Sequence, residues 1–182
     1  DDPARFKVFR WGRRTGKSRA ALLAAVDGHG ERDAEGTPQY PGLLQGAHGV
    51  WITPDYPQSR AIWREEIRPR FAGLPGVTLH ETERRVEVQG LGSLELRSAE
   101  SIDNVRGRRL DFVIADEAAH FDLEYAWHAV LRPALADREG VHQVDRDHAD
   151  QHAEEQRPDP AEGRLRIHLN IKVGLGQQER HH

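Results

Sequence analysis

The sequence predicts an α/β fold in which a mainly parallel sheet is flanked by helices, and three observations support this prediction. A short apolar alternation at residues 6–8 precedes the tripeptide Gly-Lys-Ser at 16–18, and an alanine-rich, helix-forming segment follows at 19–26. A second apolar run, residues 112–115, ends in the acidic pair Asp-Glu at 116–117. Between these two motifs, short strand patterns alternate with helix patterns, which is typical of parallel sheets with crossover helices.

The composition is that of a single-domain globular protein and does not by itself indicate a function. The chain has 182 residues, a formal net charge of −4 and 31% charged residues, which fits one domain with a sizeable core. It has no cysteine, which excludes disulfides and thiolate metal sites and is compatible with a reducing compartment. No apolar run is long enough to span a membrane, and no signal peptide precedes the first strand. Methionine is also absent, and we therefore expect an internal fragment of a longer reading frame.

Residues 10–18, Arg-Trp-Gly-Arg-Arg-Thr-Gly-Lys-Ser, predict a phosphate-binding turn. Glycine lets the backbone approach the phosphates, and the helix N-terminus directs its free N–H groups and its positive dipole end at them. Lys17 adds a positive charge, and the hydroxyl of Ser18 is placed to bind Mg²⁺. The general pattern has glycine at the position of Trp11, whereas here glycine comes one place later, at Gly12. A glycine that precedes an ordinary helix is the alternative.

Positive charge is concentrated around this turn. Seven basic residues crowd into fifteen positions: Arg5, Lys7, Arg10, Arg13, Arg14, Lys17 and Arg19. Such a cluster suits a polyphosphate or a nucleic acid, and a solvated basic loop is the alternative.

The middle of the chain predicts a series of short elements. Residues 27–49 are rich in glycine and proline and predict a loop, and residues 49–54 predict a buried strand that ends at proline. A helix is expected to begin at residues 55–59, with proline in its first turn, and to run to residue 67. One face of this helix predicts a core stripe made of Ile62, Trp63 and Ile67.

Further elements surround the second motif. Residues 77–80 and 85–88 alternate as a half-exposed hairpin does, and residues 93–97 predict another strand. The polar loop 98–109 leads into the apolar run that ends at the acidic pair. A helix is expected over residues 121–137, kinked or split at Pro133. Its buried side is predicted to carry Trp127, Val130, Leu131 and Leu135.

Asp116 and Glu117 follow a buried strand, whose carboxyl end opens at the ligand crevice of a parallel sheet. Asp116 can hold Mg²⁺ there, directly or through water, and Glu117 can accept a proton from an attacking water. An acidic helix N-terminus after a core strand is the alternative. The pairing with Gly-Lys-Ser favours a P-loop hydrolase, and a glutamate directly after the Mg²⁺ aspartate favours a hydrolase over a kinase.

Several segments occur in an order that is similar to one protein family: residues 11–18, 51–58, 98–107, 110–120 and 131–138. They resemble, in turn, the variant P-loop of the large terminase subunit of tailed double-stranded DNA phages, the strand-turn-helix after it, the loop before its second motif, that motif, and the helix that follows. The resemblance extends over residues 5–140, and a non-glycine first position such as Trp11 also fits this family.

The resemblance implies a P-loop NTPase of the RecA-like (ASCE) class, an ATPase motor that drives double-stranded DNA into a procapsid with ATP and Mg²⁺ as cofactors. Lys17 would bind the β- and γ-phosphates, Ser18 with Asp116 would hold Mg²⁺, and Glu117 would activate water. The nucleotide-binding loop would comprise Trp11, Gly12, Arg13, Arg14, Thr15, Gly16, Lys17 and Ser18.

Two arginines have further roles by resemblance. Arg13 would be a phosphate-facing arginine of the variant P-loop. Arg106 lies eleven residues before Glu117, where some family members place an arginine finger that reaches the ATP of the neighbouring subunit. A DNA contact or a solvated side chain is the alternative for Arg106. The implied partners are double-stranded DNA, other copies of the chain in a homo-oligomeric ring on the portal, and the small terminase subunit. No membrane partner is implied, and the implied location is the cytoplasm of the bacterial host.

The chain departs from the family pattern at both ends. Few residues precede the P-loop to supply the adenine-contacting segment. The predicted division is an ATPase domain at residues 1–140 and an atypical polar tail at 141–182, with no nuclease domain. The coupling strand, which in this class lies between the P-loop strand and the Asp-Glu strand, should follow Gly140 and end in a polar sensor. Residues 165–173 alternate and could supply a strand, but without that sensor, so we expect an incomplete sheet or a frameshifted end.

Two other readings stay open from the sequence. A helicase-like P-loop ATPase would need further nucleic-acid motifs, and a non-catalytic truncated terminase remnant would bind nucleotide weakly or not at all. His148 and His152 share a helix face at a spacing that can bind zinc, although no third ligand is evident and a solvated helix explains them better.

Overall fold

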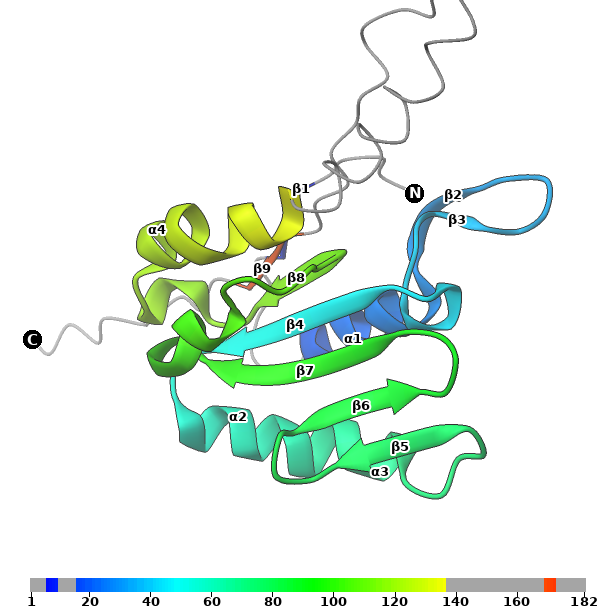
Figure 1. Ribbon diagram of the computed structural model, residues 1–182, viewed down its shortest axis with the longest axis horizontal. Coiled ribbons are helices and arrows are strands. Elements are labelled where there is room, and N and C mark those ends of the chain that lie inside the picture. Colours follow the sequence, from blue (N-terminus) through cyan, green and yellow to red (C-terminus); the bar gives the residue numbers. More distant parts are fainter. Residues whose placement is uncertain (1–5, 10–15, 137–168, 173–182) are drawn as a thin grey trace, which may run out of the picture.

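The computed structural model describes residues 6–9, 16–136 and 169–172. Seven strands form one sheet in the order β1-β9-β8-β4-β7-β6-β5 (Figure 1). Their bounds, in that order, are Phe6–Phe9, Leu169–Lys172, Phe112–Ala115, His48–Thr53, Ser93–Ser98, Arg85–Val88 and Val77–His80. The pairs from β1 to β7 are parallel, whereas β6 and β5 pair antiparallel at the edge. The predicted α/β class with a mainly parallel sheet is confirmed, as is the hairpin at 77–88.

Strand β9 corrects the expectation of an incomplete sheet. It lies within the predicted segment 165–173 and pairs in parallel with β1 on one side and with β8 on the other. It therefore occupies the position between the P-loop strand and the Asp-Glu strand, where the coupling strand is expected. The residues after β9, where a polar sensor is expected, lie outside the described part of the chain.

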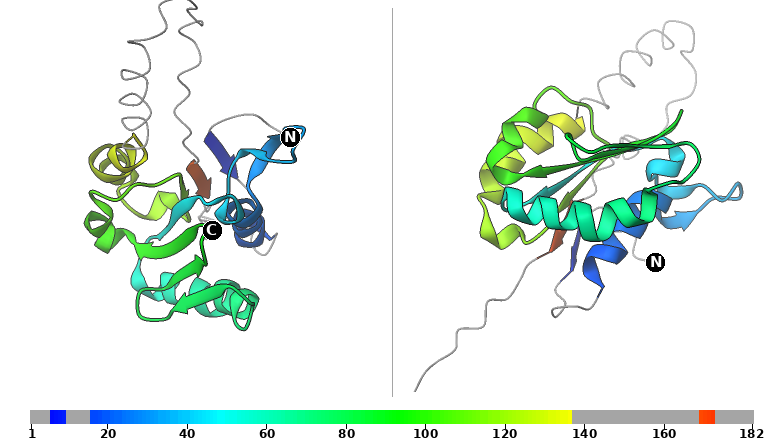
Figure 2. Two further views of the ribbon diagram at one scale, coloured as in Figure 1. Left: turned by 45° about the vertical axis from the view of Figure 1, so that its right-hand side comes forward. Right: turned by 90° about the horizontal axis from the view of Figure 1, so that it is seen from below.

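Helices cover both faces of the sheet (Figure 2). One face carries α1 (Lys17–Asp27) and a long helix built from α2 (Tyr56–Ile62), η2 (Trp63–Ile67) and α3 (Arg68–Phe71). The other face carries η3 (Ala99–Val105) and the helix that starts with α4 (Leu123–Tyr125) and η5 (Ala126–Leu131) and continues over residues 132–136. The short η4 (Ala118–His120) connects β8 to α4.

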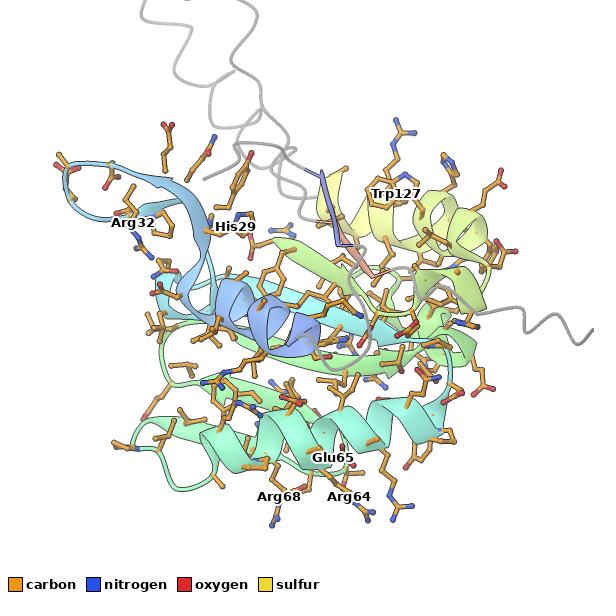
Figure 3. The ribbon with its side chains drawn as sticks, turned by 180° about the vertical axis from the view of Figure 1, so that it is seen from behind. His29, Arg32, Arg64, Glu65, Arg68 and Trp127 are labelled. Carbon is orange, nitrogen blue, oxygen red and sulfur yellow. The ribbon has the colours of Figure 1, made fainter. Side chains whose placement is uncertain are left out.

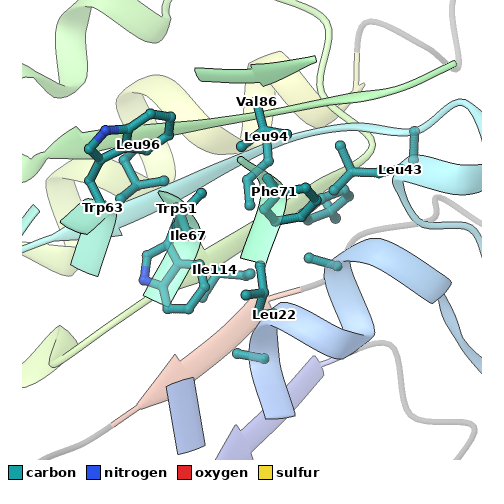
Figure 4. Close-up of a cluster of buried hydrophobic side chains, with 14 residues drawn as sticks. Leu22, Leu43, Trp51, Trp63, Ile67, Phe71, Val86, Leu94, Leu96 and Ile114 are labelled. Atoms are coloured by element: carbon teal, nitrogen blue, oxygen red, sulfur yellow. The ribbon is translucent and has the colours of Figure 1, made fainter. Parts of the chain in front are cut away.

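The period-2 alternation of the central strands divides the core into two clusters. In β4, Val50 and Ile52 contact the α4 side, while Trp51, fully buried, faces the α1 side. In β8, Phe112 and Ile114 join Trp51 in the second cluster (Figure 4). Both central strands are apolar on both faces, as expected for parallel strands covered by helices.

The long helix of the α1 side begins as predicted and extends further than predicted. The side chain of Asp55 accepts a hydrogen bond from the backbone N–H of Gln58 at 2.8 Å and caps the first turn. Trp63 and Ile67 are buried as expected, and Ile62 is partly buried. Arg64 and Arg68 point outward from the exposed side of this helix, on the opposite face of the sheet from Trp127 (Figure 3).

Both long helices contain a π-helical turn that ends two residues before a proline. The backbone N–H of Arg68 bonds the carbonyl of Trp63, ahead of Pro69, and that of Arg132 bonds the carbonyl of Trp127, ahead of Pro133. Proline has no N–H and its ring crowds the preceding turn, so a widened turn keeps the helix continuous. The helix is therefore not split at Pro133; it continues through residues 132–136 after the widened turn.

The buried side of the second helix agrees with prediction apart from one residue. Val130, Leu131 and Leu135 are buried, whereas Trp127 is only partly buried. Asp122 caps this helix by accepting a hydrogen bond from the backbone N–H of Tyr125 at 2.9 Å. Helical structure therefore starts at residue 123, two residues later than expected.

The prediction of a loop over residues 27–49 is wrong in part. Strands β2 (His29–Arg32) and β3 (Pro38–Tyr40) form a separate antiparallel hairpin there, followed by the 3₁₀ turn η1 (Leu43–Gln45). A Cβ on Gly28 would lie 2.4 Å from the carbonyl oxygen of Tyr40, so glycine is needed where the hairpin meets the end of α1. Its many glycines and short polar strands gave the segment the composition of a loop.

Within the described ranges, no helix combines the length and the apolar character needed to cross a bilayer.

Candidate active site

The two sequence motifs end at the same edge of the sheet. Strand β1 leads into the predicted phosphate-binding turn and β8 leads into the acidic pair, and both run parallel to β9 between them. Val8 of β1 and Ala115 of β8 are each in register with Ile171 of β9, so the two strands end level. Two interstrand steps separate them by about 10 Å. The topology thus places both motifs at one carboxyl edge, which is where parallel sheets bind ligands.

Gly16 and α1 form the described part of the phosphate-binding turn. Gly16 is the N-cap of α1 with φ at 82°, a left-handed conformation that favours glycine. A Cβ there would meet nothing within 4 Å, so the backbone angle and not space explains the residue. The carbonyl of Gly16 accepts the first helical bond from Ala20 at 2.9 Å.

Lys17 and Ser18 occupy the first turn of α1 and are half-buried. The helix is held against the sheet by its buried residues Ala21, Leu22 and Ala25. Its N-terminus therefore directs the positive end of the helix dipole at the carboxyl edge, as phosphate binding requires. The other predicted loop residues, Trp11, Gly12, Arg13, Arg14 and Thr15, lie outside the described residues.

Asp116 begins the turn after β8 and is held there by the sheet. Its backbone N–H donates to the carbonyl of Ile52 at the end of β4, at 2.8 Å, and only 2% of the residue is exposed. A buried carboxylate is stable only when it is hydrogen-bonded, paired or bound to a cation. With the hydroxyl of Ser18, it supplies the hard oxygen donors that Mg²⁺ prefers, so the residues present fit that ion.

Glu117 has an uncommon backbone conformation. Its φ and ψ are 53° and 42°, in the left-handed region, which costs a residue with a Cβ about 1–2 kcal/mol. Neighbouring bonds hold it there, since its carbonyl accepts from the backbone N–H of His120 at 2.9 Å. The Glu117 side chain is 27% exposed, with Oε2 4.0 Å from Nε2 of His120. Strain of this kind is characteristic of functional sites, and it turns this carboxylate away from a regular helical path.

Arg106 belongs to a closed ring of hydrogen bonds that the sequence did not reveal. Its Nε donates to Oδ1 of Asp103 at 2.8 Å, and its Nη2 donates to the hydroxyl of Tyr125 at 2.9 Å. The hydroxyl of Tyr125 in turn donates to the same Oδ1 at 3.0 Å. The bond to Asp103, and secondarily the bond to Tyr125, raises the pKa of the guanidinium above its ordinary value.

The loop that carries Arg106 is anchored to the sheet. Ile102 and Val105 are buried in the core on the α4 side. Arg108 forms an ion pair with the buried Glu95 of β7, which also pairs with Arg97. The Arg106 side chain itself is 52% exposed. The loop backbone is thus held against the sheet, while the guanidinium of Arg106 is accessible to solvent.

Metal binding by clustered side chains has no support in the described ranges. No group of three or more histidine, aspartate or glutamate side chains there could hold a metal ion. His148 and His152 lie outside those ranges. An apolar pocket lined by Ala24, Ala25, His29, Pro41 and the β8 residues 112–114 is built around the start and middle of that strand and does not include the acidic pair.

Comparison with known proteins finds relatives of this chain among phage proteins. No protein-family model matches the chain. The large terminase subunit of Thermus virus P23-45 is 31% identical to it, over 75% of this chain and 30% of that protein. The large terminase subunit of Thermus phage G20c is 30% identical over the same shares. The chain thus spans less than a third of the length of these relatives.

Solved structures agree in fold. The ATPase domain of the Thermus phage P74-26 large terminase superposes with a TM-score of 0.52 at 25% identity, over 76% of this chain and 57% of that one. The large terminase of bacteriophage HK97, at 14% identity and a TM-score of 0.50, covers 93% of this chain and 29% of its own. By sequence and by fold, the chain is a relative of the phage large terminase subunit and of its ATPase domain.

Proposed function

We propose that the chain is the ATP-hydrolysing part of a phage DNA-packaging motor. The observation that carries this proposal is the position of Lys17 and Ser18 at the same carboxyl edge as Asp116 and Glu117, with β1 and β8 level across β9. Phosphoryl transfer to water needs a phosphate cradle, a bound metal ion and a group that orients the water. Lys17 would bind the phosphates, Ser18 and Asp116 would hold the ion, and Glu117 would orient the water. The relatives of the chain reported above are named as terminase large subunits.

Each residue has a distinct part in the proposed reaction. Lys17 and the N-terminus of α1 bind the phosphate oxygens, together with Arg13 and the remaining loop residues. Ser18 and Asp116 hold Mg²⁺, which, when bound, neutralises charge that develops on the phosphoryl oxygens. Glu117 accepts the proton of the attacking water. Arg106 reaches the nucleotide of a neighbouring subunit, so that turnover depends on a ring.

The proposal extends to partners. Double-stranded DNA is the proposed cargo, and the chain works as part of a homo-oligomeric ring on the portal with the small terminase subunit, in the host cytoplasm. The reading as a non-catalytic remnant rested on a missing sheet strand, and β9 supplies a strand at that place. The helicase-like alternative shares the same ATP site and differs in what the motor moves.

Substitution of Lys17 tests the proposal. Purified chain is expected to hydrolyse ATP, faster with double-stranded DNA, and Lys17→Ala is expected to weaken ATP binding at least about tenfold, because the β- and γ-phosphates lose their point charge. ATP affinity is measured by calorimetry and turnover by phosphate release. Arg19→Ala removes an exposed charge two residues further along α1 and serves as the matched control. Absence of hydrolysis with and without DNA, together with unchanged ATP binding in Lys17→Ala, would contradict the proposal.

A further inference from the structure

The ring formed by Asp103, Arg106 and Tyr125 joins two segments that are far apart in the sequence. Asp103 and Arg106 come from the crossover between β7 and β8, whereas Tyr125 comes from α4, eight residues after Glu117. All three side chains are accessible: Asp103 and Arg106 are 60% and 52% exposed as side chains, and Tyr125 is 44% exposed. Surface ion pairs of this kind add little to folding stability, so stability does not explain a closed ring.

The ring leaves most of the guanidinium available. An arginine carries five N–H groups in a fixed plane, and these two bonds use one on Nε and one on Nη2. Both Nη1 hydrogens and the second Nη2 hydrogen remain for another acceptor. Because the plane is rigid, fixing one edge also fixes the direction of the other, and three donors in a plane suit phosphate oxygens.

We propose that Asp103 and Tyr125 are positioning residues that fix the guanidinium plane of Arg106, with its free edge directed at the nucleotide of a neighbouring subunit. This inference rests on the proposed function of Arg106 and adds which residues orient its guanidinium before it binds. An unrestrained arginine side chain loses rotamer entropy when it binds a distant phosphate. Because the hydrogen bonds to Asp103 and Tyr125 already restrict Arg106, less entropy is lost when it binds. The anchor from Arg108 to Glu95 and the buried Val105 keep the base of the loop still.

The ring also connects Arg106 to the segment that leaves Glu117. Asp122 caps α4 by accepting a hydrogen bond from the backbone N–H of Tyr125, so the tyrosine is placed by the first turn of α4, which follows η4. A shift of this turn would move the hydroxyl of Tyr125 and with it Arg106. The short η4 joins the acidic pair to α4, so the pair and Tyr125 lie on one continuous segment.

Substitutions in the ring test this proposal in the full chain at concentrations where hydrolysis is maximal. Tyr125→Phe removes the hydroxyl and keeps the aromatic side chain. It is expected to lower kcat about fivefold with an unchanged KM for ATP. Asp103→Ala is expected to lower kcat about tenfold or more, while Asp103→Asn, which keeps an acceptor oxygen at the same place, restores most of it. Thermal unfolding midpoints should stay within about 2 °C of the wild type, because these side chains are exposed.

Matched controls and the outcomes separate this proposal from the proposed function. Tyr56→Phe alters another exposed tyrosine, and Glu100→Gln alters an exposed carboxylate of the same segment as Asp103; both should leave kcat unchanged. If Arg106→Ala abolishes turnover while Tyr125→Phe and Asp103→Ala do not change it, positioning is refuted and the proposed function stands. A higher kcat in Tyr125→Phe refutes it too, since the ring would then restrain the arginine. If the wild-type chain hydrolyses no ATP at any concentration, both proposals fall.

Discussion

Replacement of Glu117 by glutamine is expected to lower the kcat of ATP hydrolysis by about 10²–10⁴-fold, while the affinity for ATP stays within about twofold of the wild-type value. The amide has nearly the same shape as the carboxylate but cannot accept the proton of the attacking water. In the proposed site, phosphate binding depends on the first turn of α1 and does not involve this side chain. Phosphate release under single-turnover conditions, with ATP binding measured separately, provides the two numbers.

The control for Glu117 is an acid nearby that has no part in the reaction. Glu124→Gln alters an exposed glutamate of α4 and should keep full activity. If Glu117→Gln hydrolyses ATP at the wild-type rate, the general base is a different group and the assignment is wrong. If both hydrolysis and ATP binding disappear, the strained turn at Glu117 has collapsed, and the residue acts through the fold.

Arg106→Ala is expected to reduce turnover by about a thousandfold, because a guanidinium that stabilises the charge of the phosphoryl group in the transition state is lost. The reduction should appear in subunits that bind ATP normally, since the arginine acts on a neighbour's nucleotide. Wild-type turnover should rise steeply with chain concentration as subunits meet. Arg109→Ala removes an exposed arginine of the same loop and is the matched control.

Mixing two inactive variants shows whether Arg106 acts between subunits. Arg106→Ala keeps Glu117, and Glu117→Gln keeps Arg106, so an equimolar mixture can form sites that contain both groups. Activity above the sum of the two separate samples is the expected result. No recovery in the mixture, combined with turnover that is independent of concentration, would show that Arg106 acts within its own chain or not at all.

Much of this site could be predicted because its chemistry depends on neighbouring residues. Gly16 must adopt a positive φ, Lys17 and Ser18 must open a helix, and Asp116 must follow a buried strand, and each requirement leaves a local pattern. The central strands were also recognisable, since their apolar runs reflect burial on both faces.

The remaining features depend on contacts between distant residues. Tyr125 meets Arg106 across 19 positions, and no local pattern marks a tyrosine whose hydroxyl bonds an arginine. The alternation at 165–173 predicted a strand, but the place of β9 in the sheet is set by its pairing with β1 and β8. The left-handed conformation of Glu117 was likewise hidden, because glutamate carries no preference for it.

The central claim is that the first turn of α1 and the end of β8 form one Mg²⁺-dependent nucleotide site. The most direct measurement is the ATP dissociation constant, with and without Mg²⁺, for the wild type, Ser18→Ala, Asp116→Asn and the double variant. If both residues hold the same ion, each single substitution should remove most of the gain in affinity that Mg²⁺ provides, and the double variant should lose much less than the sum of the two free-energy changes. Additive effects, or an Asp116→Asn variant whose ATP affinity depends on Mg²⁺ as the wild type's does, would contradict the claim.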